Sequence, residues 1–211
     1  YGDCSGDRKA RFRDALKLFG EMFGTGFAGD NLIALQRSAG FRKEPSFAAA
    51  LARHASNDQE RSLSWRLHTQ VWAAQQALHV PGDFVECGVW TGFCSAVVAD
   101  CVGFADSGRG FYLYDTFSGI PERMNSEARS NRVYERQTAD DPDAIYKIAQ
   151  GRFGGYRNVR LVRGIVPDSF AEACPERIAY LHLDMNSAAS EIAALDALFD
   201  RLVPGGMIVF D

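Results

Sequence analysis

The stretch GDFVECGVWTGFCSAVVADCV, residues 82–102, decides the fold because one tight turn joins two different apolar segments. Its first part, DFVECG, is typical of a buried strand. Its last part, FCSAVVADCV, has the small and apolar residues of a helix packed on a sheet. The turn carries Gly88 and Gly92, but it lacks both the G-x-G-x-x-G dinucleotide pattern and the G-x-x-x-x-G-K-[ST] phosphate loop. The stretch therefore predicts a strand–turn–helix unit that is not built around a phosphate.

The same alternation of strand and helix continues to residue 211. We expect strands at 83–88, 110–117, 159–164, 177–184 and 207–211, and helices at 93–102, 141–155, 166–174 and 190–206. Apolar strands separated by helices indicate a parallel sheet that is covered on both faces. Right-handed crossovers then give a doubly wound, mostly parallel, Rossmann-like α/β fold. The polar segment 118–143 is predicted to be a mobile loop over the site.

In the first 80 residues apolar side chains recur at helical spacing, which predicts helices. We expect them at 7–26 (stopped by Gly24), at 29–40 (capped by Asp30), at 44–56 and at 56–82. The chain is therefore expected to consist of a helical N-terminal extension or lid, residues 1–80, and a ligand-binding core, residues 81–211. Aromatic side chains on these helices favour a homo-oligomer.

Composition excludes several classes of protein. The chain has 211 residues, of which 46% are hydrophobic and 24% charged, as in a globular domain. The net charge of −4 with no basic stripe argues against nucleic acid as a partner, and no apolar run approaches the roughly 20 residues that a membrane helix needs. Five cysteines without a CxxC pair argue against a disulfide framework. No signal peptide is visible, so we expect a reduced, cytoplasmic protein.

Carboxylates stand at the ends of four expected strands: Glu86, Asp115, Asp184 and Asp211. Ligands of open parallel sheets bind outside the carboxyl ends of the strands. A buried sheet disfavours charge unless the charge is paired or used. The four residues therefore mark the expected site.

The first two carboxylates indicate the kind of ligand. Glu86 adds negative charge beside the turn, which suits an ammonium group better than a phosphate, and Asp115 stands where an acidic side chain accepts ribose hydroxyls. S-adenosylmethionine carries both an ammonium group and a ribose, and it has no phosphate. We expect its amino group at Glu86, its ribose at Asp115 and its adenine near Gly164 and Ile165. The remaining expected contacts of the cofactor are Gly88, Val89, Thr91, Gly92, Thr116, Phe117 and Asp184.

Five segments fall in the order and spacing of a known family: GDFVECGVWTGF, FYLYDTFSGIPE, LVRGIVPDSF, RIAYLHLDMNS and LVPGGMIVFD. Together they resemble the macrocin O-methyltransferase family over about residues 81–211. Its members are class I S-adenosylmethionine-dependent methyltransferases that methylate hydroxyls, often sugar hydroxyls of natural products. The resemblance implies a class I methyltransferase sheet and a small-molecule hydroxyl acceptor such as a sugar.

The resemblance also implies Mg²⁺, held by Asp184 and Asp211 and by a further acidic residue after Asp211. Asp184 would then be catalytic as well, because Mg²⁺ prefers hard oxygen ligands and lowers the pKa of a bound hydroxyl. Two points depart from the family. Residues 185–187 read Met-Asn-Ser instead of a stretch with Gly and Asp. The chain also stops in a central strand, so the C-terminal strands are expected to be missing.

Other interpretations stay open. The turn at 88–92 could be a structural turn without a ligand, and Asp184 could be a helix cap. A nicotinamide-dependent oxidoreductase is a rival, although the sequence lacks its fingerprint and a catalytic Tyr-x-x-x-Lys. A non-catalytic binding protein that keeps the cofactor fold is a second rival, favoured by the altered residues 185–187.

A general base does not emerge from the sequence. His182 lies inside a strand and is expected to be a core residue, while His54 and His68 belong to the N-terminal part. Three residues of the polar segment, Arg129, Arg132 and Tyr134, could contact the substrate or belong to a solvated loop.

Overall fold

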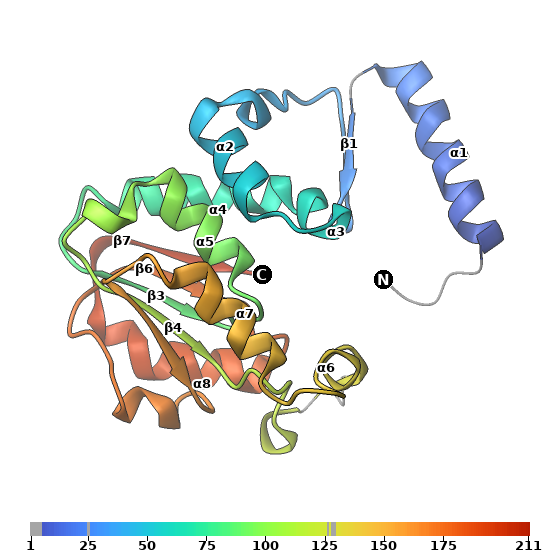
Figure 1. The fold of residues 1–211 in the computed structure, drawn as a ribbon. Helices are drawn as coiled ribbons and strands as arrows, with labels where there is room; N and C mark the ends of the chain where they lie inside the picture. The colour runs from blue at the N-terminus through green and yellow to red at the C-terminus, as the bar shows by residue number, and fades with distance from the viewer. Residues whose placement is uncertain (1–5, 25, 126, 128–129) are drawn as a thin grey trace.

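The computed structural model describes residues 6–24, 26–125, 127 and 130–211. Its centre is a five-stranded sheet in which every pairing is parallel (Figure 1). In spatial order the strands are β5 (Val159–Arg163), β4 (Phe111–Asp115), β3 (Asp83–Cys87), β6 (Ile178–Leu183) and β7 (Leu202–Phe210). The expected strands are therefore present, in a parallel arrangement.

The strand order reverses beside β3. The chain starts in the middle of the sheet with β3, runs outward through β4 and β5, and returns to β6 on the other side of β3. Phe84 of β3 is in register with Phe111 of β4 and with Tyr180 of β6. In such sheets the reversal leaves a crevice at the carboxyl ends of the two diverging strands.

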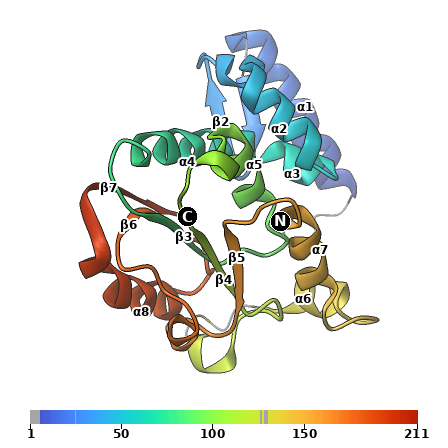
Figure 2. The ribbon, with the colours of Figure 1, turned by 60° about the vertical axis from the view of Figure 1, so that its left-hand side comes forward.

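Helices cover both faces of the sheet, as Figures 1 and 2 show. Apolar residues of α4 (Ser64–Ala77), α5 (Phe93–Cys101) and α7 (Ala144–Phe153) share one core cluster with Phe84 and Leu113. On the opposite face, α8 (Ala188–Leu198) packs against Val85 and Leu181. Successive strand residues thus enter opposite clusters, as the pleat requires. The predicted doubly wound α/β fold is confirmed.

Some boundaries in the core differ from the prediction. The helix expected at 166–174 is one short 3-10 turn, η4 (Asp168–Ala171), and a second 3-10 turn, η2 (Phe104–Asp106), follows α5. The helix expected at 190–206 is α8 followed by η5 (Phe199–Arg201), and β7 already begins at Leu202, which is in register with Ile178. The Pro-Gly-Gly sequence at 204–206 disfavours a strand, but pairing with β6 stabilises one there.

The polar segment 118–143 is not wholly a loop. It contains the 3-10 turn η3 (Glu122–Met124) and the helix α6 (Arg132–Gln137). Asn131, just before α6, bonds through its side chain to both backbone groups of Ile120, so the segment is tied back on itself. Of the three substrate-contact candidates in this segment, Arg129 lies outside the described residues.

The N-terminal part is only partly helical. The first helix, α1 (Gly6–Phe23), ends at Gly24 as predicted. The helix expected at 29–40 is wrong, because β1 (Gly26–Gly29) and β2 (Leu32–Leu35) form an antiparallel hairpin. Asp30 and Asn31 make its two-residue turn with φ of 51° and 58°. Aspartate and asparagine tolerate this left-handed conformation, so Asp30 is a turn residue and not a helix cap.

The remaining N-terminal helices pack on the core. After the 3-10 turn η1 (Gly40–Lys43), α2 (Pro45–His54) lies within the range expected at 44–56. The helix expected at 56–82 is divided at Leu63 into α3 (Asp58–Ser62) and α4. Phe27 of the hairpin packs against Trp65 of α4, with ring centroids 5.5 Å apart. No helix among the described residues is long and apolar enough to cross a membrane.

A single arginine joins the end of α4 to the start of the sheet. The guanidinium of Arg109 donates hydrogen bonds of 2.7 to 3.2 Å to the carbonyl oxygens of Ala77, Leu78, Val80 and Gly82. These carbonyls lie at and beyond the end of α4, where helical partners are missing. Arg109 therefore satisfies several backbone acceptors at once.

Replacing Arg109 with methionine is expected to lower the free energy of unfolding by about 2–4 kcal/mol, because half-buried carbonyls lose a charged donor. Urea denaturation measures this loss. Arg160→Met is the matched control, since Arg160 is exposed and lies 3.7 Å from Glu172. Equal losses in the two variants would show that the Arg109 hydrogen bonds contribute nothing special.

Candidate active site

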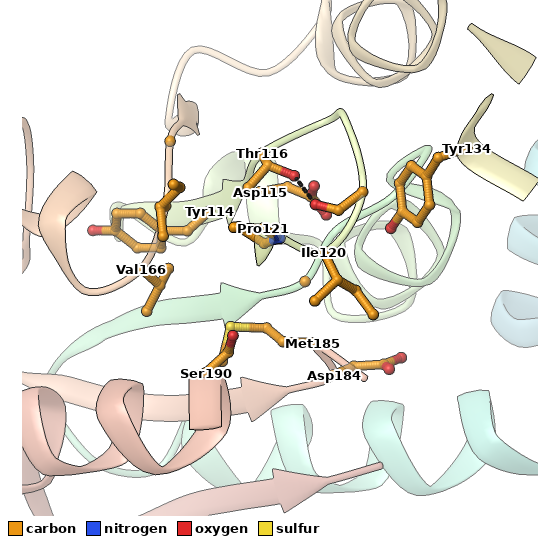
Figure 3. A pocket seen from close by; sticks show the side chains of 14 residues that line it. Tyr114, Asp115, Thr116, Ile120, Pro121, Tyr134, Val166, Asp184, Met185 and Ser190 are labelled. Carbon is orange, nitrogen blue, oxygen red and sulfur yellow. Dashed lines mark hydrogen bonds between the residues drawn. The ribbon is translucent and has the colours of Figure 1, made fainter. Parts of the chain in front are cut away.

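A cavity opens where the carboxyl ends of β3, β4 and β6 meet, and the close-up in Figure 3 shows its lining. Its walls come from these strand ends, from the loop after β5 and from the segment between β4 and α7. The lining residues are Gly88, Tyr114, Asp115, Thr116, Gly119, Ile120, Pro121, Tyr134, Gly164, Ile165, Val166, Asp184, Met185 and Ser190. The cavity thus lies where the fold predicts a ligand.

The cavity brings together only part of the predicted site. Six predicted residues line it: Gly88, Asp115, Thr116, Gly164, Ile165 and Asp184. Five others are buried or lie behind the wall: Glu86, Val89, Thr91, Gly92 and Phe117. Asp211 does not line this cavity but a second one.

Asp115 holds the first turn in place. Its Oδ2 accepts hydrogen bonds of 2.7 Å from the backbone N–H groups of Val89 and Trp90, and its Oδ1 accepts one of 2.6 Å from Phe117. Burial raises the pKa of Asp115, and these N–H groups oppose that effect. A carboxylate has about four acceptor positions. Asp115 therefore has room for about one further hydrogen bond unless a backbone group is displaced.

Glu86 lies beneath the turn and does not line the cavity. Its side chain is 4% exposed, its Oε2 accepts a 2.7 Å hydrogen bond from Ser95 of α5, and its Oε1 lies 3.5 Å from Nδ1 of His182. Burial lowers the pKa of His182, but the negative charges of Glu86, Asp184 and Asp211 together outweigh burial and leave that pKa raised. His182 is a buried residue, as predicted, and contacts Gln70 of α4 at 3.1 Å. Glu86 thus belongs to a buried polar network in this structure.

Gly88 is required by the fold as well as by the cavity. Its φ is +93°, and a Cβ atom there would lie 1.9 Å from the carbonyl oxygen of Asp184. The sequence analysis expects a cofactor contact at Gly88 and does not predict this closer neighbour. Gly92 has φ of +76°, and a Cβ there would meet the ring of Phe153 on α7 at 2.7 Å. The absence of a side chain at Gly92 therefore permits close packing of this turn against α7.

The other cavity residues are held by local contacts. Thr116 donates a 2.7 Å hydrogen bond from Oγ1 to the carbonyl of Gly119, which is the dashed line in Figure 3. The N–H of Gly164 donates to the carbonyl of Asp115 at 2.9 Å, which joins two walls of the cavity. Phe117 is fully buried with φ of +53° and packs against Tyr146. These contacts shape the wall below the predicted ribose and adenine positions.

Tyr134 is the residue whose role the sequence left undecided. It reaches the cavity from α6, and its ring packs on Trp90 with centroids 4.2 Å apart. Burial raises the pKa of its hydroxyl far above the ordinary value. No periodic pattern marked it, because α6 was not predicted. The histidines left open lie elsewhere: His54 contacts Asp100, and His68 stacks on Phe41.

Asp184 and Asp211 converge on one cation, Arg66 of α4. Nη1 of Arg66 lies 3.2 Å from Oδ2 of Asp184 and also contacts Oδ2 of Asp211. The other side of the guanidinium pairs with Asp30, the turn residue of the hairpin. Burial and then repulsion by Asp211 raise the pKa of Asp184 to about 7. The predicted pair of carboxylates is therefore close together, with an arginine between its members.

The donor set partly fits the Mg²⁺ that the resemblance implies. Two carboxylates share a single cationic atom, so one small cation could contact both, and both offer the hard oxygen ligands that Mg²⁺ prefers. Within the described part of the chain, however, no group of three or more His, Cys, Asp or Glu residues could hold a metal. The pair would thus need waters or further ligands to complete an octahedron.

The fold and the cavity define an α/β protein with a cavity at the switch point of its sheet. The lining holds two aspartates and, among the described residues, no lysine or arginine, so it suits a ligand without phosphates. The family model for Macrocin-O-methyltransferase (TylF) matches residues 64–211, which is more than half of the chain. The chain belongs to this family, and the resemblance seen in its sequence is confirmed.

Two curated relatives are similar to the chain. One is the 8-demethyl-8-(2,3-dimethoxy-alpha-L-rhamnosyl)-tetracenomycin-C 4'-O-methyltransferase of Streptomyces olivaceus, 30% identical over 63% of this chain and 53% of that protein. The other is the mycinamicin III 3''-O-methyltransferase of Micromonospora griseorubida, 28% identical over 69% of this chain and 61% of that protein. The chain thus spans between half and two thirds of the length of these relatives.

Solved structures support the fold. The O-methyltransferase NovP superposes with a TM-score of 0.56 and 22% identity, covering 69% of this chain and 64% of NovP. The calicheamicin methyltransferase CalS11 gives a TM-score of 0.57 and 20% identity over all of this chain and 80% of CalS11. At these identities the likeness shows a class I methyltransferase fold.

Gly88→Ala is expected to lower the free energy of unfolding by at least about 3 kcal/mol, because the new Cβ meets a backbone carbonyl that cannot move aside. Gly103→Ala is the matched control: its φ is also positive, at +60°, but nothing lies within 4 Å of the added Cβ. The control should lose only about 1–2 kcal/mol, the cost of the left-handed conformation. Chemical denaturation compares the two, and equal losses would contradict the close contact with Asp184.

In the metal-free protein the raised pKa of Asp184 makes stability depend on pH. The folded state keeps the proton that the unfolded state has already released, so stability is higher at low pH and falls as pH rises from about 4 to about 7. Asp184→Asn removes this loss and is expected to stabilise the protein by roughly 2–4 kcal/mol at pH 8, and by much less at pH 5. Denaturation in the presence of a chelator measures it. Asp58→Asn, at a fully exposed site, should change nothing, and a pH-independent effect at Asp184 would contradict the assigned burial.

Proposed function

We propose that the protein is an S-adenosylmethionine-dependent O-methyltransferase that methylates a hydroxyl of a sugar or of a sugar-bearing natural product. The observation that carries this proposal is membership of the macrocin O-methyltransferase family across residues 64–211. Its similar relatives are named for methylation of a rhamnosyl tetracenomycin and of mycinamicin III. The acceptor class follows those names.

The cavity fits the cofactor chemically. S-adenosylmethionine carries a sulfonium and an ammonium group and no phosphate, and the cavity offers Asp115 and Asp184 with no basic residue among its described lining. The same lining disfavours a nicotinamide dinucleotide, whose pyrophosphate needs free N–H groups or basic side chains. In this turn, the N–H groups of Val89 and Trp90 are already occupied by Asp115.

We assign the following roles within this proposal. Asp115 would accept one ribose hydroxyl with its remaining acceptor position, and Gly164 and Ile165 would border the adenine. Glu86 would attract the ammonium group of the cofactor electrostatically from below the turn. The backbone at Gly88, Val89, Thr91 and Gly92 would shape the methionine end, and Thr116 and Phe117 the ribose side.

When bound, the cofactor supplies an electrophilic methyl group, and the protein has to hold the acceptor oxygen in line with it. Asp184 lies at the border of the cavity, where it could orient the acceptor hydroxyl. Asp184 and Asp211 would hold a Mg²⁺ ion, whose chemical contribution would be a lower pKa of a hydroxyl bound to it.

We further propose that residues 81–211 form the cofactor-binding core and residues 1–80 an extension that closes over it. The protein would work in the cytoplasm and self-associate through α1, whose exposed side chains include Leu18, Met22 and Phe23. A second candidate function is a binding protein of the same fold without catalysis. It is favoured by Arg66, which stands between the two carboxylates expected to bind a metal.

Isothermal titration with S-adenosylhomocysteine is expected to show binding at micromolar concentrations, and titration with NAD is expected to show none. Methylation of rhamnosyl and related deoxysugar acceptors, with Mg²⁺ or with a chelator, then tests the transfer. Absence of S-adenosylhomocysteine binding to the folded protein would overturn the proposed function. Binding without transfer to any acceptor would favour the binding protein instead.

A further inference from the structure

The guanidinium of Arg66 is surrounded by three carboxylates that come from distant parts of the chain. Nε and Nη2 donate to the two oxygens of Asp30 at 2.6 and 2.8 Å, which is a bidentate pair. Nη1 donates to Asp184 at 3.2 Å and also to Asp211. All four side chains are at most 28% exposed, so solvent screens these contacts only in part.

The guanidinium uses different nitrogens for its different partners: Nε and Nη2 for Asp30, and Nη1 for Asp184 and Asp211. A bidentate pair fixes both the position and the plane of an arginine. Asp30 alone therefore holds Arg66, whereas Asp184 and Asp211 share a single nitrogen. If that nitrogen moved away from the pair, the guanidinium would still keep its partner Asp30.

The charges around Arg66 do not balance. With all groups ionised, three carboxylates face one guanidinium, which leaves two negative charges in a half-buried place. The guanidinium of an arginine is not deprotonated in proteins, so Arg66 contributes one full positive charge. The excess of negative charge would therefore stabilise a further cation bound at the cluster.

A second cavity gives an ion access to this cluster. Asp30, Trp65, Arg66 and Asp211 line it, together with Gln70 and His182 in its floor. Gln70 and His182 are 1% exposed. Nδ1 of His182 lies 3.5 Å from Oε1 of Glu86, whereas Oε1 of Gln70 has no hydrogen-bond partner among the described residues. Asp184 lines the first cavity, so the Arg66 cluster forms the boundary between the two. A buried polar atom without a partner beside a polar cavity indicates room for water or for a hydrated ion.

We propose that Arg66 is a built-in cation that competes with a divalent metal ion for the carboxylates of Asp184 and Asp211, and that Asp30 retains Arg66 when its Nη1 leaves them. The proposal rests on the metal site of the proposed function. Without metal, Arg66 offsets the repulsion between the two carboxylates. With metal, the Asp30 pair prevents the arginine from being left half-buried without a partner. Metal affinity is thereby coupled to the β1–β2 hairpin.

Titration with Mn²⁺, followed by the electron paramagnetic resonance of the free ion, tests this competition, because Mn²⁺ takes the same oxygen ligands as Mg²⁺. Arg66→Gln is expected to bind Mn²⁺ about tenfold more tightly or better, because a positive charge a few ångströms from the ion is removed. Asp30→Asn is expected to bind it several-fold more weakly, since Arg66 then has only the pair to contact. The proposal therefore predicts changes of Mn²⁺ affinity in opposite directions for the variants of Arg66 and Asp30.

Matched controls separate this effect from general changes of charge. Arg160→Gln and Asp58→Asn alter exposed residues and should leave the Mn²⁺ affinity within about twofold, as screened surface charges do. Adding Asp184→Asn and Asp211→Asn to the Arg66→Gln protein should abolish the binding. Arg66→Met, which fills the space differently, repeats the test if the glutamine variant does not fold. Unfolding temperatures confirm that each variant is folded.

Two results would overturn the proposal: Mn²⁺ affinity that is unchanged or lower in both neutral variants of Arg66, or no Mn²⁺ binding in any of the proteins. Titration with S-adenosylhomocysteine on the same samples keeps the two proposals distinct. If that ligand binds while the Arg66 variants fail as described, the competition is wrong and the methyltransferase proposal stands. If it does not bind, the proposed function fails whatever the metal does.

Discussion

The approach of the Gly88 backbone to the carbonyl of Asp184 is the contact on which the site depends. These residues follow β3 and β6, the neighbouring strands at which the order of the sheet reverses. Because no side chain fits between them, the two strand ends meet directly, and Asp184 reaches the edge of the cavity. Asp115 then ties the end of β4 to the same turn through backbone N–H groups. The position of the turn beside the cavity is therefore fixed by backbone groups of β3 and β6 together with the side chain of Asp115.

Local pattern predicted the sheet well because each strand and each covering helix carries its own signal in hydrophobicity. It also predicted which strand ends carry carboxylates, and the cavity collects Asp115 and Asp184 as expected. It did not predict Arg66, which contacts a carboxylate 118 residues away, since no local rule announces a long-range ion pair. The hairpin at Asp30 was misread because LIAL fits both a helix and a strand, and the turn pair Asp-Asn was the signal to weigh.

The helix α4 supplies polar partners to the carboxyl edge of the sheet. Arg66 and Gln70 are four residues apart and so lie on one face of α4. Arg66 meets Asp184 and Asp211, and Gln70 meets His182, which in turn lies beside Glu86. Charges that a buried sheet would disfavour are thus neutralised from the N-terminal part of the chain. This part is integral to the electrostatics of the site, in addition to any role in covering it.

The positions of two tryptophans give the molecule an optical property. Trp65 lines the second cavity next to Arg66 and packs on Phe27 of the hairpin, whereas Trp90 packs on Tyr134, which lines the first cavity. Indole emission responds to nearby charge and to exposure to water. Each cavity therefore has its own fluorophore, and the third tryptophan, Trp72, is half exposed on α4 and provides a solvent-facing background. In variants that keep only Trp65 or only Trp90, indole fluorescence would report on one cavity at a time.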